Sequence, residues 1–201
     1  MRTPQIQSRA REKLLDAAQK LMLVKGYPAT TIDEICATAR LTKGSFFHYF
    51  ENKEDLGKAL LDRYASSGQR IEWTALRINN RDPLERVYGY LDLSARLYQR
   101  PHGRNGCLLG NFAQELSETH PAIRSLCAER FDEWAGMFKR ALDEAKVKHR
   151  PRASLDTQGL AEHFIAVLEG SLILGKAHRD MRIVRKNLGH FKQYLKMIFQ
   201  E

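Results

Sequence analysis

The sequence has few of the features that mark secreted, membrane or metal-binding proteins. Its three cysteines, Cys36, Cys107 and Cys127, are odd in number and widely spaced. Such a set fits reduced thiols in a cytoplasmic protein better than a disulfide framework or a zinc site, so we expect no metal and no cofactor. No apolar run approaches the roughly 18 residues that cross a bilayer. The charged N-terminus is followed by no uninterrupted apolar stretch, which argues against a signal peptide.

The patterns typical of strands and of common enzymes are missing as well. Alternating β-branched runs between turn residues are absent, and apolar residues instead recur at three- and four-residue intervals, which predicts an all-α protein. Glycine-rich phosphate loops, metal-ligand clusters and nucleophile elbows are also lacking. An enzyme would have to use Cys107 as nucleophile with His102, His120 or His163 as base. We therefore predict that the protein is not an enzyme.

Positive charge is what the sequence has in excess. Its 33 lysines and arginines outnumber 24 aspartates and glutamates, for a net charge of +9. Between Met1 and Lys53 nine basic residues stand against five acidic ones. An excess of this sign favours a polyanionic partner such as DNA.

Capping and helix-breaking residues predict about nine helices along the chain. The segment from Thr31 to Leu56 has the most specific pattern. Thr31 and Glu34 have the spacing of a capping box, Thr42 is placed to cap a second short helix, and Asn52 a third. Two short helices joined by a tight turn form a helix-turn-helix, whose second helix enters the DNA major groove. The other helices are expected over about 8–25, 52–78, 84–98, 107–116, 122–147, 157–179 and 181–199.

The second short helix has the composition of a DNA-reading helix. It carries small residues where backbone would approach DNA, and hydrogen-bond donors for phosphates and base edges. Phe46 and Phe50 are four residues apart and are expected to pack into a three-helix core. The alternative is an amphipathic helix without a partner. The residues that we predict to contact DNA are Thr31, Arg40, Thr42, Lys43, Gly44, Ser45, His48, Tyr49 and Lys53.

The segment from Arg11 to Leu56 resembles the DNA-binding domain of TetR-family transcriptional repressors. The matching stretches read KGY at 25–27, TTIDEI at 30–35, TKGSFFHYF at 42–50 and NKEDL at 52–56. The resemblance implies a helix-turn-helix domain over residues 1–52 and a larger helical effector-binding and dimerisation domain over residues 53–201. Two departures stand out. Phe47 replaces a tyrosine that often contacts phosphate in the family, which shifts anchoring to Tyr49, and Arg40 replaces a frequent turn glycine.

Cys107 is the sharpest sensor candidate in residues 53–201. It follows Gly106 at a predicted helix N-terminus, where backbone donors lower the pKa of a thiol. The segment from Gly106 to Asn111 also resembles family members in which a cysteine senses electrophiles or oxidants. The alternative is a small buried hydrophobic residue beside a non-reactive ligand. Aromatic and polar residues suit an effector pocket between helices, with ordinary packing as their alternative role. Those predicted to line it with Cys107 are Trp73, Tyr88, Asn111, Phe112, Glu115, Trp134 and His163.

The last two helices mix small and large apolar residues, which allows close helix approach. Two such helices from each subunit would form a four-helix bundle with two-fold symmetry. Intramolecular packing uses the same pattern, and the family resemblance favours the homodimer. The predicted interface residues are Leu168, Ser171, Leu174, Gly175, Leu188, Phe191 and Leu195.

These observations predict a homodimeric repressor that binds a palindromic operator in double-stranded DNA. A small-molecule effector or an electrophile would release it by stabilising a different spacing of the reading helices. The alternative among DNA-binding proteins is an architectural protein without an effector, which would show weak sequence preference.

Overall fold

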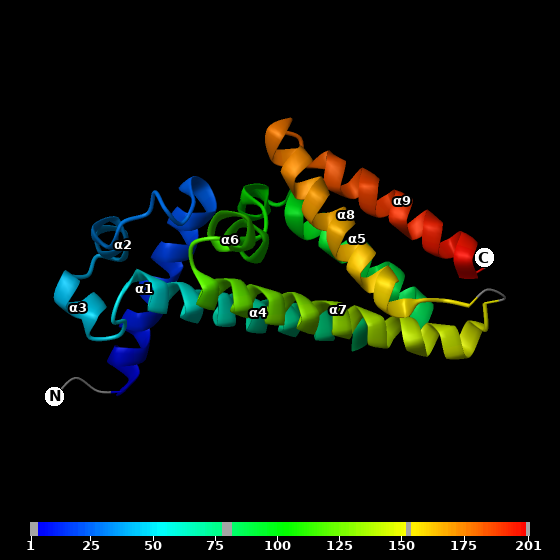
Figure 1. Cartoon of the computed structure of the whole chain (residues 1–201), viewed down its shortest axis with the longest axis horizontal. Coiled ribbons are helices and arrows are strands. Elements are labelled where there is room, and N and C mark those ends of the chain that lie inside the picture. The colour runs from blue at the N-terminus through cyan, green and yellow to red at the C-terminus, as the bar shows by residue number, and fades with distance from the viewer. Residues whose placement is uncertain (1–3, 78–81, 152–153, 200–201) are drawn as a thin grey trace. The chain divides into compact units, whose positions relative to one another are not determined.

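The computed structural model describes residues 4–77, 82–151 and 154–199, and these form helices joined by turns without any strand (Figure 1). The predicted all-α class with about nine helices is therefore confirmed. The described elements are α1 (Pro4–Lys25), α2 (Ile32–Ala39), α3 (Lys43–Phe47), α4 (Lys53–Arg77), α5 (Pro83–Gln99), the 3-10 helix η1 (Pro101–Asn105), α6 (Leu108–Leu116), α7 (Pro121–His149), α8 (Thr157–Ala177) and α9 (Arg182–Phe199). Among these helices none has the length and apolarity needed to cross a membrane.

The chain divides into two compact units, and each takes segments from two parts of the sequence. The N-terminal unit comprises Met1–Ser66 and Leu108–Glu129, and the C-terminal unit comprises Ser67–Cys107 and Arg130–Glu201. The start of α4, all of α6 and the start of α7 thus pack with the helix-turn-helix. The functional boundary predicted after residue 52 stays a prediction.

Apolar residues at helical spacing build the core of the N-terminal unit. Leu14, Leu15 and Met22 form a buried stripe on α1, which packs against α2, α3 and α6. The helix ends at Lys25, and the chain turns at Gly26, whose φ of +85° is costly for other residues. Phe46 is fully buried and its ring centroid lies 5.6 Å from that of Phe50, which confirms that both belong to this core.

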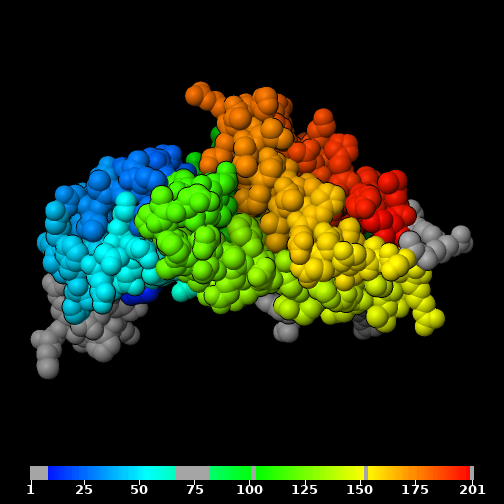
Figure 2. Space-filling view, in the orientation of Figure 1, coloured from blue at the N-terminus to red at the C-terminus, as the bar shows by residue number. Residues whose placement is uncertain are grey.

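The C-terminal unit is a bundle in which α9 packs along α5 and α8. Asp82 begins α5 by accepting hydrogen bonds from the backbone N–H groups of Leu84 and Glu85, and Pro83 occupies the first turn. Buried aromatic rings fill the centre, where Phe138 and Phe164 stack with centroids 4.5 Å apart. A hairpin of α8 and α9, orange and red in Figure 2, ends in a turn at the surface.

Candidate DNA-binding interface and sensor residues

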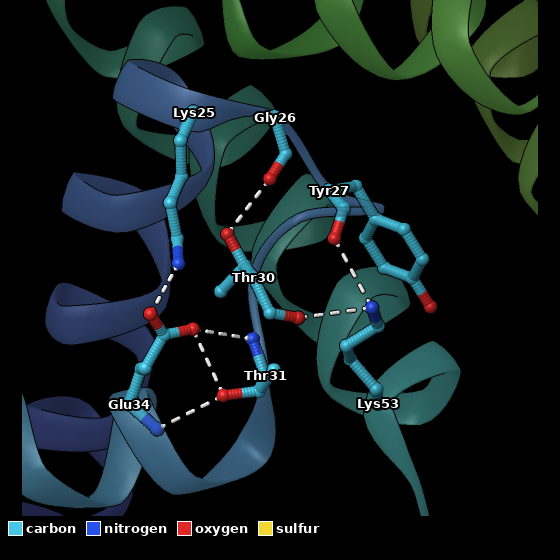
Figure 3. Close-up of polar contacts among 7 residues, drawn as sticks. All are labelled: Lys25, Gly26, Tyr27, Thr30, Thr31, Glu34 and Lys53. Atoms are coloured by element: carbon cyan, nitrogen blue, oxygen red, sulfur yellow. Dashed lines mark hydrogen bonds and ion pairs between the residues drawn. The ribbon is translucent and has the colours of Figure 1, made fainter.

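The start of α2 is fixed by the capping box that the sequence predicts. The Thr31 hydroxyl accepts a hydrogen bond from the Glu34 N–H at 3.3 Å, and the Thr31 N–H donates to Glu34 Oε2 at 2.9 Å. The Lys25 ammonium donates to the other carboxylate oxygen of Glu34 (Figure 3). These hydrogen bonds, that from Lys25 first, lower the pKa of Glu34 to about 2. Glu34 therefore stays ionised and ties the end of α1 to the start of α2.

The turn before α3 is built around a left-handed residue. Arg40 has φ 57° and ψ 46°, and its N–H donates to the carbonyl groups that end α2. This is the position where the family often carries glycine, so the chain makes the same turn with an arginine in a costly conformation. Thr42 then begins α3, since its hydroxyl accepts from the Ser45 N–H at 3.1 Å.

Most of the predicted DNA contacts lie on one short exposed segment. Thr42, Lys43, Gly44 and His48 are exposed, whereas Ser45 and Tyr49 are half-buried, and Arg40 and Thr31 are exposed at the neighbouring caps. The Lys43 ammonium lies 2.7 Å from Asp33 Oδ1, yet its side chain remains 62% exposed. A Cβ placed on Gly44 would meet only Thr42 Oγ1, at 3.7 Å, so nothing within the protein requires glycine there. Phe47, the residue in place of the family's tyrosine, is 55% exposed.

Lys53 occupies a different environment from the other predicted DNA contacts. Its ammonium donates to the carbonyl oxygens of Tyr27 at 3.1 Å and Thr30 at 3.0 Å, and lies 4.3 Å from the centre of the Tyr27 ring (Figure 3). Burial lowers the pKa of this ammonium, and the charge of Lys25 adds to the effect. Lys53 therefore holds the loop between α1 and α2, and its predicted phosphate contact stays a prediction.

Two residues predicted for the effector pocket instead contact Tyr27 in the N-terminal unit. The Tyr27 N–H donates to Glu115 Oε2 at 2.7 Å, and the Tyr27 ring meets Phe112 edge-on with centroids 5.5 Å apart. Asn111 belongs to the same helix, α6, and is half-buried. The structure thus groups these three residues with the helix-turn-helix, and their predicted role toward a ligand is untested.

The remaining sensor candidates that the structure describes lie in the C-terminal unit. Cys107 and Tyr88 are each 2% exposed, and the indole N–H of Trp134 donates to the Tyr90 hydroxyl at 2.7 Å. His163 is exposed, with its ring next to those of Phe191 and Tyr194. The side chain of Trp73 lies outside the described residues. The predicted ligand set is therefore divided between the two units.

Cys107 has a neighbour that the sequence analysis missed. Its thiol donates a hydrogen bond to the carboxyl group of Glu169. Burial raises the pKa of Glu169 to about 7, against the lowering influence of Cys107 and Lys176. Lys176 also lies next to Gly106, and its ammonium would be 3.3 Å from a Cβ added to that glycine. The available signal was a single acidic residue within the apolar run LEGSLILG at 168–175.

Most residues predicted for the dimer interface are covered within the protomer. Leu168, Ser171, Gly175, Leu188, Phe191 and Leu195 are buried by their own chain, because α8 and α9 pack against each other and the core. Leu174 is the exception, at 47% exposed. The outward apolar surface of these helices also includes Ile173, Tyr194 and Met197. It borders a groove of about 460 Å³ lined by residues such as His163 and Asn187.

Comparison with known proteins gives matches over both parts of the chain. Residues 14–60 match the model for bacterial regulatory proteins of the tetR family, and residues 83–191 match the model for the tetracyclin repressor-like C-terminal domain. The transcriptional regulator AcuR of Cereibacter sphaeroides is 31% identical over 169 residues, 84% of this chain and 77% of that protein. The transcriptional repressor DhaR of Mycobacterium sp. (strain GP1) is 28% identical over 190 residues, 94% of this chain and 90% of that protein.

A solved structure shows the same arrangement of helices. The crystal structure of Escherichia coli NemR in its reduced form superimposes with a TM-score of 0.79 at 26% sequence identity, and the match covers 92% of this chain and 96% of that one. The match extends over both units.

Proposed function

Because the chain belongs to the TetR family of bacterial transcriptional regulators, we propose that it is a homodimeric repressor released from a palindromic operator by an effector. DNA binding and regulation of transcription come with the family. The dimer, the symmetry of the operator and the release are the proposed parts. We expect the protein to work in the cytoplasm, without a cofactor and without catalysis.

The observation that carries the DNA interface is the exposed edge of α3. The buried side chains of Phe46 and Phe50 anchor this segment in the core, while Lys43, Gly44 and His48 are exposed to solvent. In a two-fold dimer, two such helices about 34–36 Å apart would fit successive turns of the major groove. A groove contact needs donors and a close backbone approach, and this edge offers both.

Operator binding tests this part of the proposal. We expect a DNase footprint with two-fold symmetry in the DNA beside the protein's own gene. Lys43→Ala should weaken operator affinity and reduce the slope of log affinity against log salt by about 1, because one phosphate contact is lost. Lys20→Ala is the matched control, since Lys20 is an exposed lysine on α1 of the same unit. Equal effects of the two substitutions, or an asymmetric footprint, would count against the proposal, and weak sequence preference would favour an architectural role.

The dimer is proposed to form through the outer face of α8 and α9. Ile173, Leu174, Tyr194 and Met197 expose apolar side chains there, and an exposed apolar face of this kind is typical of a surface that a second copy covers. Leu174→Glu should convert the dimer to monomer in analytical ultracentrifugation. Glu162→Lys, a charge change at an exposed site on α8, serves as control.

Cys107 is the candidate for a reactive signal, and its contact with Glu169 favours it over the other thiols. A buried carboxyl with a pKa of about 7 can accept the thiol proton as a thiolate forms. The solved structure of the similar protein NemR is described as its reduced form, which fits redox chemistry in that protein. Operator binding with and without N-ethylmaleimide should separate the two kinds of effector. Loss of the response in Cys107→Ser, but not in Cys127→Ser, supports the Cys107 thiol. A response retained in both variants points to the third thiol, Cys36, and no response in the wild type supports a non-covalent ligand.

A further inference from the structure

A basic pocket lies beside the turn between α8 and α9 in the C-terminal unit. It encloses about 850 Å³, within the range of small-molecule sites. Cationic side chains reach it from three elements: Arg104 from η1, Lys176 from the end of α8, and Arg182 from the start of α9. Arg179 adds a fourth from the turn itself. One carboxylate, that of Asp180, shares the lining with these four cations.

Asp180 does not neutralise the pocket, because its carboxylate is held by Arg182. Its two oxygens accept hydrogen bonds from Nε and Nη2 of Arg182, each at 2.8 Å, and one of them also accepts the Arg182 backbone N–H at 3.0 Å. Lys176 faces the half-buried Glu169, which carries only part of a negative charge near neutral pH because burial of its carboxyl raises its pKa to about 7. The charge of Arg104 and Arg179 therefore has no carboxylate among the lining residues to balance it.

A buried amide in the pocket wall adds an independent sign of a missing partner. The Nε2 atom of Gln99, at the end of α5, is buried and has no hydrogen-bond acceptor. Gln99 also lines the pocket. A buried donor without an acceptor is unfavourable, and most such groups in folded proteins are satisfied by a protein atom, water or a ligand. An oxyanion bound in the pocket would supply the acceptor that this donor lacks.

We propose that the pocket beside the α8–α9 turn binds a small anionic ligand through a carboxylate or phosphate group. The guanidinium groups of Arg104 and Arg179 supply charged donors in a planar fork, which suits an oxyanion, and the Gln99 amide supplies a neutral one. A concave site with a buried donor fits a compact anion that enters it better than the flat backbone of duplex DNA. This inference does not rest on operator binding and holds for the DNA-free protein.

The test is a titration of the full, isotope-labelled chain followed by two-dimensional ¹H–¹⁵N NMR spectra. The probes are sodium phosphate and sodium succinate, each compared with sodium chloride at equal ionic strength. We expect a saturable shift of the amide signals of Gln99, Arg104 and residues 175–182 with at least one probe. A response to phosphate alone indicates a phosphate ligand, and a response to succinate alone indicates a carboxylate ligand. A response to both indicates a site that binds anions without distinguishing the two groups.

Arg179→Gln should raise the dissociation constant of the responding probe about tenfold or more, because one charge-assisted hydrogen bond is lost. Arg150→Gln is the matched control and should leave the affinity unchanged. Arg150 is also exposed, follows the end of a helix and has a left-handed backbone, with φ 48° against 52° at Arg179. Both substitutions therefore remove the same charge from the same kind of backbone.

Gln99→Met separates a role in binding from a role in folding. It removes the unpaired donor and keeps a side chain of similar length, so the ligand-free protein should unfold at the same or a higher temperature while the probe binds more weakly. The proposal is overturned if neither probe gives a saturable shift beyond that of sodium chloride. Equal loss of affinity in Arg179→Gln and Arg150→Gln would overturn it as well.

Discussion

Glu115→Ala should destabilise the N-terminal unit through the loss of one specific bond. The Tyr27 N–H donates to Glu115 Oε2 at 2.7 Å, two residues beyond the end of α1 at Lys25. Removing the carboxylate leaves this N–H without its acceptor in a partly buried position. A hydrogen bond to a charged group contributes about 1.5–3 kcal/mol, and the exposure of Glu115 favours the lower end of that range. We therefore expect a loss of about 1.5 kcal/mol in the free energy of unfolding.

Thermal unfolding followed by circular dichroism measures this loss. For a chain of this size, about 1.5 kcal/mol corresponds to a fall of roughly 3–6 °C in the midpoint. Glu115→Gln keeps an oxygen acceptor and should fall by less than Glu115→Ala. Glu118→Ala is the control, since Glu118 is an exposed glutamate two residues beyond α6. If Glu115→Ala and Glu118→Ala unfold at the same temperature, the bond to Tyr27 does not hold α6 against the helix-turn-helix.

The other predictions concern the backbone at Gly44 and Arg40 and the half-buried acid Glu169. Gly44→Ala should leave stability unchanged or raise it by up to about 1 kcal/mol, since alanine favours helix and only Thr42 Oγ1 lies near the new methyl group, while gel-shift affinity for the operator falls. Arg40→Gly should stabilise the protein by about 1 kcal/mol in chemical denaturation by relieving the left-handed strain, whereas Arg40→Ala, which removes the same charge and keeps the strain, should not. Glu169 binds its proton more tightly in the folded state, at a pKa of about 7 against 4.5, so the stability that it contributes is present below pH 4.5 and is lost as the pH rises to about 7. The loss is on the order of 3 kcal/mol, and urea titrations of Glu169→Gln should lack that part of the pH dependence.

Helix boundaries were predictable wherever a polar cap or a breaker fixes the backbone locally. The capping box of Thr31 and Glu34, the Thr42 cap and the Asn52 cap, whose Oδ1 accepts the Asp55 N–H at 2.9 Å, all occur in the structure. Between the helices expected over about 84–98 and 107–116, Pro101–Asn105 form the 3-10 helix η1 before Gly106 turns at φ +87°. Turn residues indicate where a helix stops, and the short-range hydrogen bonds of a 3-10 segment have no comparably specific sequence signal.

The partners of individual side chains were predictable only where they lie close in sequence. The contact of Glu115 with Tyr27 spans 88 residues, and nothing in the local pattern of α6 distinguishes it from a ligand contact. The same limit applies to α9, where the apolar stripe of Leu188, Phe191 and Leu195 serves the protomer core. Periodicity identifies an apolar face, and tertiary packing decides what covers it.

Helix α6 follows the candidate sensor Cys107 directly in the chain and packs on α1 within the N-terminal unit. Cys107 directly precedes α6, and α6 carries both Phe112 and Glu115 against Tyr27. A change at the Cys107–Glu169 contact that moves the start of α6 would therefore act on a bond at the end of α1 through one short, stiff helix. If α6 transmits the signal, the effects of Cys107→Ser and Glu115→Ala on effector-induced operator release should be non-additive. The double variant should then release the operator to the same extent as the less responsive of the two single variants. Additive losses in that double-mutant cycle would mean that the two residues act independently and that the signal reaches the reading helices by another element.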